Sequence, residues 1–345
     1  DCLPVDETCR PLRKAILYGI DARASKEIAF LNTHYGEARI KELFGHPLCS
    51  DDIAPKIMWI KNNEPEVYAR TFKFLTGSSY ITAKLTGEYV IDQFLAKSSF
   101  SPLYDKNGSI SEEECTLFCR PDQLARCCFV HEIAGYVTPQ AAAETGLKEG
   151  TPVICGTGDS TSEAISVGIT EPGKLMFQFG SSLFFYYCSD RLTYDHRIHG
   201  HNFTVPDTFS VSGGTNTAGT LTRWMRDTLY FDLLEEQQQT GAEPYQLMME
   251  RVADIPAGSS GLIVLPYFAG ERCPINDALA KGMIFGLTLE HTRDHIYHAA
   301  LEGIAYGIAQ NIRVMEELGL PVENLIAVGG GTKNHVWMQI VADVI

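Results

Sequence analysis

The chain has 345 residues, of which 45% are hydrophobic and 21% are charged. This composition is typical of a folded globular protein, and the length is typical of two domains. Acidic residues outnumber basic ones by 43 to 28, a net charge of −15, and the basic residues form no long cluster. A face that binds the phosphate backbone needs such a cluster, so we expect no nucleic-acid partner.

No apolar run approaches the roughly eighteen residues that span a bilayer, and no secretory signal is visible. Ten cysteines are too few for a disulfide scaffold in a chain of this length. The spacing of Cys115, Cys119, Cys127 and Cys128 lacks the second pair of a zinc ribbon, so we interpret them as buried thiols. We therefore expect a cytoplasmic protein with no membrane contact and no metal-ligand set of its own.

Apolar residues recur at helical spacing in the first part of the chain. They predict an amphipathic helix over 22–44, ended by Gly45. A second helix is predicted to begin at Ile53 and to end before Pro65, because proline disfavours its continuation.

A third helix is predicted to end at Gly87, where glycine can adopt the left-handed conformation of a helix cap. Residues 89–92 follow as a short strand. Residues 97–114 show neither the helical nor the strand period and are predicted to form a loop.

The segment Thr151–Cys155 is apolar and predicts a strand of the parallel type, which Gly156–Asp159 turns into a helix that runs to Ile169. Open α/β sheets bind their ligands at the carboxyl ends of such strands. Asp159 therefore stands where a catalytic carboxylate could lie. It could equally cap the helix, because aspartate is a preferred N-cap residue.

After Glu171-Pro-Gly173 the sequence changes character, and we place a domain boundary between residues 170 and 171. Two strands, Leu175–Phe179 and Leu183–Tyr187, are predicted to be joined by a tight turn at Gly180. Helices and strands that alternate in this way indicate an α/β architecture.

Further along the chain, a helix is predicted through Leu229, a buried strand over 263–265, and a long helix over 294–318. Glycine-rich turns are predicted at Gly180, Gly213–Gly214 and Gly329–Gly331. Only glycine lets backbone amides approach a polyphosphate closely, so these turns together predict a nucleotide cradle. Each turn by itself could equally be an ordinary turn or a β-bulge.

Several enzyme classes lack their motifs here. The chain has no Gly-x4-Gly-Lys-Ser/Thr loop and no protein-kinase signature. Gly156-Thr-Gly158 is not followed by the third glycine of a dinucleotide fingerprint. No aspartate lies three residues before a histidine, as an esterase of the GDSL type would need.

Four motifs, the first of them in two parts, carry a resemblance to a known family. Residues 282–287, followed after seven residues by 295–303, resemble the C-terminal signature of the FGGY family of carbohydrate kinases. Residues 56–63 resemble part of its N-terminal signature, and residues 265–272 and 329–334 also look like the family. The resemblance covers nearly the whole chain, in order, and is nearest to xylulokinase-like members.

The resemblance implies a two-domain α/β fold of the actin-like ATPase (ribonuclease H-like) class with an interdomain cleft. It implies a partial sugar-binding N-terminal domain over 1–170 and a partial nucleotide-binding C-terminal domain over 171–345. Family members have segments before and after the region matched by this chain. We therefore expect an internal fragment, with both domains incomplete.

The activity implied by the resemblance is ATP-dependent phosphorylation of a hydroxyl of a small ketose or polyol, with a xylulose-like pentulose as the expected substrate. Mg²⁺ is expected beside ATP, because it bridges the β- and γ-phosphate oxygens. Glycerol, gluconate and ribulose stay open as other substrates. An actin-like protein that binds nucleotide or sugar without turnover is the non-enzyme alternative. A homodimer is considered, although the sequence does not reveal the oligomeric state.

The resemblance also implies roles for individual residues. Asp159 matches the catalytic aspartate, the general base. The residues that match the nucleotide-binding positions of the family are Gly180, Ser181, Gly219, Gly330 and Asn334.

Other positions match the family less closely. Arg223 stands where glycerol kinase has glutamine, and Asp51 and Ile53 depart from the N-terminal signature. Asp21 and Arg23 resemble an element beside the sugar pocket, although a structural ion pair is an equal interpretation.

Overall fold

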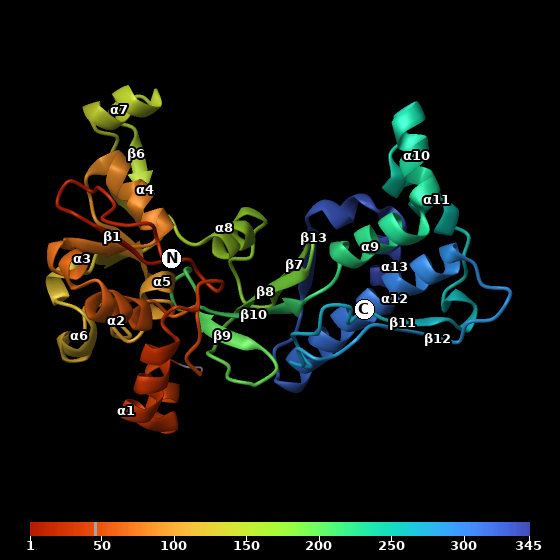
Figure 1. Ribbon diagram of the computed structural model, residues 1–345, viewed down its shortest axis with the longest axis horizontal. Helices are drawn as coiled ribbons and strands as arrows, with labels where there is room; N and C mark the ends of the chain where they lie inside the picture. The colour runs from red at the N-terminus through yellow and green to blue at the C-terminus, as the bar shows by residue number, and fades with distance from the viewer. Residues whose placement is uncertain (45–46) are drawn as a thin grey trace. The chain divides into compact units, whose positions relative to one another are not determined.

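The computed structural model describes residues 1–44 and 47–345, and the chain divides into two compact units (Figure 1). Unit 1 comprises Asp1–Ser166, Asp190–Leu192 and His201–Phe209. Unit 2 comprises Val167–Ser189, Thr193–Gly200 and Ser210–Ile345. The predicted helix stop at Gly45 lies outside the described residues.

Unit 1 is mainly helical, with short strands paired two by two. Its helices are α1 (Ser25–Phe44), α2 (Ile53–Asn63), α3 (Pro65–Arg70), α4 (Gly77–Thr86), α5 (Gln93–Lys97), α6 (Glu112–Phe118), α7 (Pro139–Thr145) and α8 (Asp159–Ser166). Its strands are β1 (Leu3–Val5), β2 (Lys73–Leu75), β3 (Val90–Asp92), β4 (Arg126–Cys128), β5 (Ile133–Tyr136) and β6 (Pro152–Ile154). The β1–β2 and β5–β6 pairs are antiparallel, and the β3–β4 pair is parallel.

The helix predicted to end at Gly87 is confirmed as α4, and local residues satisfy both of its ends. Thr76 accepts a hydrogen bond from Ser79 N–H at the start of α4, and Gly87 ends this helix in the left-handed conformation. The helix predicted over 22–44 begins at Ser25 and contains a break at Gly36, which has a φ of 71°. Periodicity alone did not reveal this break.

The core of unit 1 gathers around α2. Ile53, Ile57 and Ile60 of this helix are fully buried. Lys56, on the same helix, is only 1% exposed, and its Nζ donates a 2.8 Å hydrogen bond to the carbonyl of Leu17. The buried ammonium thus fixes the segment that leads to Asp21, while burial lowers its own pKa.

Unit 2 is built on a mixed sheet of five strands in the order β13-β7-β8-β10-β9 (Figure 1). The strands are β7 (Lys174–Phe179), β8 (Leu183–Ser189), β9 (His199–Asn202), β10 (Phe209–Thr215) and β13 (Asn324–Val328), and a separate antiparallel pair joins β11 (Ile263–Leu265) to β12 (Met283–Phe285). The helices are α9 (Gly219–Leu229), α10 (Phe231–Thr240), α11 (Pro244–Val252), α12 (Arg293–Glu317) and α13 (His335–Val344).

The core of unit 2 lies between the sheet and its helices. The predicted hairpin is confirmed, since β7 and β8 pair antiparallel with Phe177 opposite Phe185. The long helix predicted over 294–318 is confirmed as α12. Its residues Ala300, Leu301 and Ile304 are at most 1% exposed.

Two predicted features of the strands are wrong. Gly213 and Gly214 do not form a phosphate turn, because they lie inside β10. A Cβ on Gly213 would lie 2.6 Å from the ring of Phe185, so the sheet itself requires the small residue. The strand before Asp159 is not of the parallel type among the described residues, because β6 pairs antiparallel with β5.

In residues 1–44 and 47–345, no helix is both long and apolar enough to cross a membrane.

The packing of α12 on β11 predicts opposite effects of two glycine substitutions on one helix. A Cβ on Gly303 would overlap the carbonyl oxygen of Val264, whereas on Gly307 its nearest atom would be 3.9 Å away. Gly303→Ala should lower the free energy of unfolding by about 1–3 kcal/mol through overpacking. Gly307→Ala should raise it by up to about 1 kcal/mol, because alanine favours helix. Urea denaturation measures both changes, and equal effects would contradict the packing described.

Candidate active site

The parallel pairing of β13 with β7 brings two glycine-containing turns to one edge of the sheet. In this register Val328 lies opposite Gln178, so both strands end within a few residues of that pair. Gly180 follows β7, and Gly329 follows β13. The carboxyl ends of neighbouring parallel strands are where α/β sheets bind ligands. The structure thus gathers two of the predicted nucleotide-binding segments.

The start of α9 joins the same edge through a very close backbone approach. Gly219 N–H donates to the carbonyl of Gly180 at 3.0 Å, and Thr220 N–H donates to that of Ser181 at 2.9 Å. A Cβ on Gly219 would lie 2.5 Å from the Gly180 carbonyl oxygen, a distance that no side chain tolerates. Glycine at 219 is therefore required for the first turn of α9 to dock on the turn between β7 and β8.

The turn after β13 packs on the end of β7. A Cβ on Gly329 would lie 2.7 Å from the Phe179 carbonyl oxygen, and one on Gly331 would lie 2.8 Å from the Phe179 Cβ. In contrast, a Cβ on Gly330 would meet no atom within 4 Å. Gly330 therefore borders open space, while the glycines on both sides of it serve packing.

Ser181 and Asn334 differ in their surroundings. Ser181 is exposed, and its hydroxyl takes part in none of the hydrogen bonds recorded for the described residues. Asn334 caps α13, because its Oδ1 accepts the Trp337 N–H at 3.0 Å, and its Nδ2 donates to the Tyr297 hydroxyl at 3.4 Å. Arg223 is exposed on α9, one turn after Gly219.

A buried carboxylate, for which the sequence motifs predicted no role, braces the segment that leads to α9. Glu271 is 4% exposed, and its Oε1 accepts the N–H groups of Asn216 at 3.0 Å and of Arg272 at 2.7 Å. Burial raises the pKa of this carboxyl group. The resemblance of residues 265–272 to the family was the available signal, but it did not reveal a contact with the 216–218 loop.

Asp159 belongs to unit 1, where it is the first residue of α8 and is exposed. One of its carboxylate oxygens, Oδ1, accepts the N–H of Ser160 at 2.7 Å. The charge of Asp159 also contributes to the pKa of Tyr18, which is raised first by desolvation and then by Asp51. Asp159 thus lies near the segment that begins at Leu17.

That segment carries the predicted pair of charged residues as an ion pair. Arg23 contacts both carboxylate oxygens of Asp21, with Nε–Oδ1 at 2.8 Å and Nη2–Oδ2 at 2.7 Å, and the guanidinium lowers the pKa of this carboxyl. The guanidinium of Arg23 also stacks over Trp59 at 4.8 Å. Asp51, which departs from the family signature, adds to the raised pKa of Tyr18 through its negative charge.

A second buried carboxylate supports the turn that carries Asp159. Asp92 is 2% exposed, and its Oδ1 accepts the Thr157 hydroxyl at 3.0 Å. Burial raises the pKa of Asp92 to about 6, although the hydrogen bonds from Thr157, Leu95 and Phe94 oppose the shift. Spacing along the sequence gave no signal for this contact, because the two partners lie 65 positions apart.

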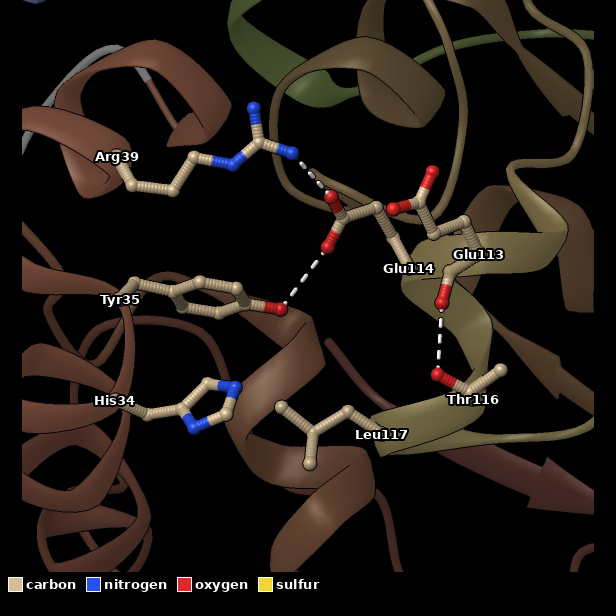
Figure 2. A pocket seen from close by; sticks show the side chains of 7 residues that line it. All are labelled: His34, Tyr35, Arg39, Glu113, Glu114, Thr116 and Leu117. Carbon is tan, nitrogen blue, oxygen red and sulfur yellow. Dashed lines mark hydrogen bonds and ion pairs between the residues drawn. The ribbon is translucent and has the colours of Figure 1, made fainter.

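Two pockets, one in each unit, lie away from the predicted site residues. In unit 1, Figure 2 shows a pocket of about 490 Å³ where Arg39 and Tyr35 of α1 point toward Glu114 of α6. In unit 2, a pocket of about 1190 Å³ lies between α12, α13 and β11. Neither pocket is lined by Asp159, Gly180, Ser181, Gly219, Gly330 or Asn334. Within the described residues, no group of three or more His, Cys, Asp or Glu side chains is placed to hold a metal ion.

The raised pKa of Asp92 predicts a pH-dependent contribution to stability. The native state takes up this proton near pH 6 and the unfolded state near pH 3.8, so the charged form destabilises the fold. Protonation of Asp92 therefore adds up to roughly 3 kcal/mol to the free energy of unfolding as the pH falls from 7 to 4. The same stabilisation is lost as the pH rises again.

Asp92→Asn removes that contribution. The free energy of unfolding of wild type, minus that of the variant, should therefore rise on acidification. Urea denaturation from pH 7 to pH 4 measures this difference, and a difference independent of pH would contradict the assignment.

Three comparisons identify relatives of the chain. The model of the FGGY family of carbohydrate kinases, N-terminal domain, matches residues 1–166, and the model of its C-terminal domain matches residues 175–345. A xylulose kinase of Staphylococcus epidermidis is 30% identical over 344 residues, and a gluconokinase of Bacillus subtilis is 28% identical over 346 residues. These alignments cover 99% of this chain, but only 66% and 67% of the two relatives.

The solved structures agree with the sequence relatives. The crystal structure of xylulose kinase from Rhodospirillum rubrum matches with a TM-score of 0.84 and 29% identity, over 99% of this chain and 68% of that chain. The predicted fold class, the two-domain α/β fold of the actin-like ATPases, is confirmed. The chain belongs to the FGGY family of carbohydrate kinases.

Proposed function

We propose that the protein phosphorylates a hydroxyl of a small ketose with ATP, and that the acceptor is xylulose or a similar pentulose. The observation that carries the proposal is the gathering of Gly180, Ser181, Gly219 and Gly330 at the carboxyl ends of β7 and β13. Xylulose kinases among the relatives support the choice of acceptor.

The nucleotide would be bound by unit 2. The exposed Ser181 hydroxyl offers a hydrogen bond to the terminal phosphates, and the open space beside Gly330 leaves room for the adenosine side. Asn334, which already caps α13, is the proposed amide on that side. The N–H groups of Gly219 and Thr220 hold the turn in place, so their role is to shape the site.

Mg²⁺ belongs to the same proposal. This ion keeps several waters and is commonly held by substrate phosphates with one or two carboxylates. We propose that the ion is held mainly by the phosphates of ATP. When bound, Mg²⁺ neutralises charge on the phosphates.

Asp159 is the proposed general base. Its carboxylate accepts the proton of the acceptor hydroxyl while that oxygen forms a bond to the γ-phosphorus. The bond between the γ-phosphorus and the bridging oxygen breaks, ADP leaves, and the proton later passes to solvent. The exposure of Asp159 and its place at the end of a glycine-containing turn support this role.

The remaining assignments are part of the proposal. We assign sugar binding to residues 1–170 and nucleotide binding to residues 171–345, in a cytoplasmic enzyme that forms a homodimer. Gluconate is a second candidate acceptor, because a gluconokinase is among the relatives. Glycerol and ribulose are further candidates, and binding without turnover is the non-enzyme alternative. A kinase assay of the complete protein against a panel of ketoses and polyols distinguishes these acceptors from one another and turnover from binding alone.

Replacing the base tests the chemistry. Asp159→Asn should lower kcat for xylulose by about 10² or more, because the amide cannot accept the proton. The affinity for ATP, measured by calorimetry, should stay nearly unchanged. Asp105→Asn is the control, since this exposed aspartate caps its own loop. Turnover retained in Asp159→Asn would exclude the assigned role.

Filling the open space in unit 2 tests the nucleotide site. Gly330→Ala should leave the unfolding temperature unchanged, because the new methyl group meets no atom within 4 Å. It should weaken ATP binding about tenfold or more, because the methyl group occupies room needed by the ligand. Gly307→Ala is the control in the same unit. Equal ATP affinity of the Gly330 variant and the wild type would place the nucleotide elsewhere.

A further inference from the structure

Asp92 is a buried acid that the mechanism above does not use. Its Oδ1 caps α5 by accepting the N–H groups of Phe94 at 3.0 Å and Leu95 at 3.3 Å. An asparagine oxygen could accept the same two hydrogen bonds without the cost of a buried charge. Capping of α5 alone therefore does not account for a carboxylate at this position.

The same oxygen accepts a third hydrogen bond, from the Thr157 hydroxyl at 3.0 Å. Its partner oxygen, Oδ2, has no hydrogen bond among the described residues. Hydrogen bonds to a charged acceptor are about twice as strong as those between neutral groups. The Oδ1 atom of Asp92 thus accepts hydrogen bonds from three donors, and its charge strengthens each of them. One of these donors, the Thr157 hydroxyl, belongs to the turn before Asp159.

Thr157 lies in the middle of a turn whose two ends are already fixed. The Cys155 N–H donates to a backbone carbonyl at 2.9 Å, and the Gly158 carbonyl accepts the Ser162 N–H at 3.0 Å. A Cβ on Gly158 would lie 3.7 Å from Leu95 Cδ2, so the turn also rests on α5. Between these two ends, the Gly156 N–H donates to the Val130 carbonyl at 3.3 Å, and the Thr157 hydroxyl is the side-chain attachment of the turn.

We propose that Asp92 is a positioning residue for phosphoryl transfer: through Thr157 it holds the 156–158 turn in the conformation that presents the carboxylate of Asp159. The inference rests on the proposed role of Asp159 as the general base. A base must lie within hydrogen-bond reach of the proton that it accepts, and a displacement of about 1 Å can cost up to about 10² in rate. Loss of the hydrogen bond between Asp92 and Thr157 should therefore lower kcat.

The test removes the hydroxyl and leaves the buried acid in place. In the complete protein, Thr157→Val should lower kcat for xylulose about tenfold, with KM for xylulose and for ATP within twofold of wild type. Thr157→Ser restores the hydroxyl and should bring kcat back to within about twofold. Thr33→Val removes a hydroxyl that bonds its own helix, at Ala29, and is the matched control.

Hydrogen exchange separates this inference from the proposed function. The amides of residues 156–160 should exchange faster in Thr157→Val than in wild type, and at the wild-type rate in Thr157→Ser. An unchanged kcat in Thr157→Val, or unchanged exchange, overturns the inference. A wild type that fails to phosphorylate xylulose overturns the proposed acceptor, while the exchange rates still report whether Thr157 holds the turn.

Discussion

The parallel pairing of β13 with β7 is the constraint on which the candidate nucleotide site depends. Strands 324–328 and 174–179 are far apart in the sequence, yet their carboxyl ends become neighbours in one register. The glycine turns that follow them can then share one edge of the sheet. A shift of this register by one residue would reverse which side chains face the core.

Close backbone approaches complete that edge, and they divide the glycines into two groups. Gly219, Gly329 and Gly331 leave no room for a Cβ, because a carbonyl oxygen or an aromatic side chain lies against them. Gly330 borders open space instead. The sequence does not distinguish the two groups. In the structure, Gly219, Gly329 and Gly331 serve backbone packing at the candidate site, whereas Gly330 borders the space in which we propose that the nucleotide binds.

Buried charges perform a related task in each unit. Lys56 binds the carbonyl of Leu17, Asp92 binds the hydroxyl of Thr157, and Glu271 binds the N–H of Asn216. Each of these charges costs free energy on burial. Each is hydrogen-bonded to a segment without regular secondary structure that leads to a candidate site residue. In each case the free-energy cost of the buried charge is offset in part by a hydrogen bond that fixes the conformation of the loop.

Short-range patterns along the chain were sufficient to predict the local structure and the family. The helices at 53–63 and 293–317, the hairpin at Gly180 and the identity of the FGGY family all follow from short-range spacing and motifs. Three features became apparent in the folded chain alone: Gly213 and Gly214 serve the sheet, β6 pairs antiparallel, and Asp92 reaches the turn before Asp159. These features depend on contacts between distant segments, for which periodicity and spacing carry no information.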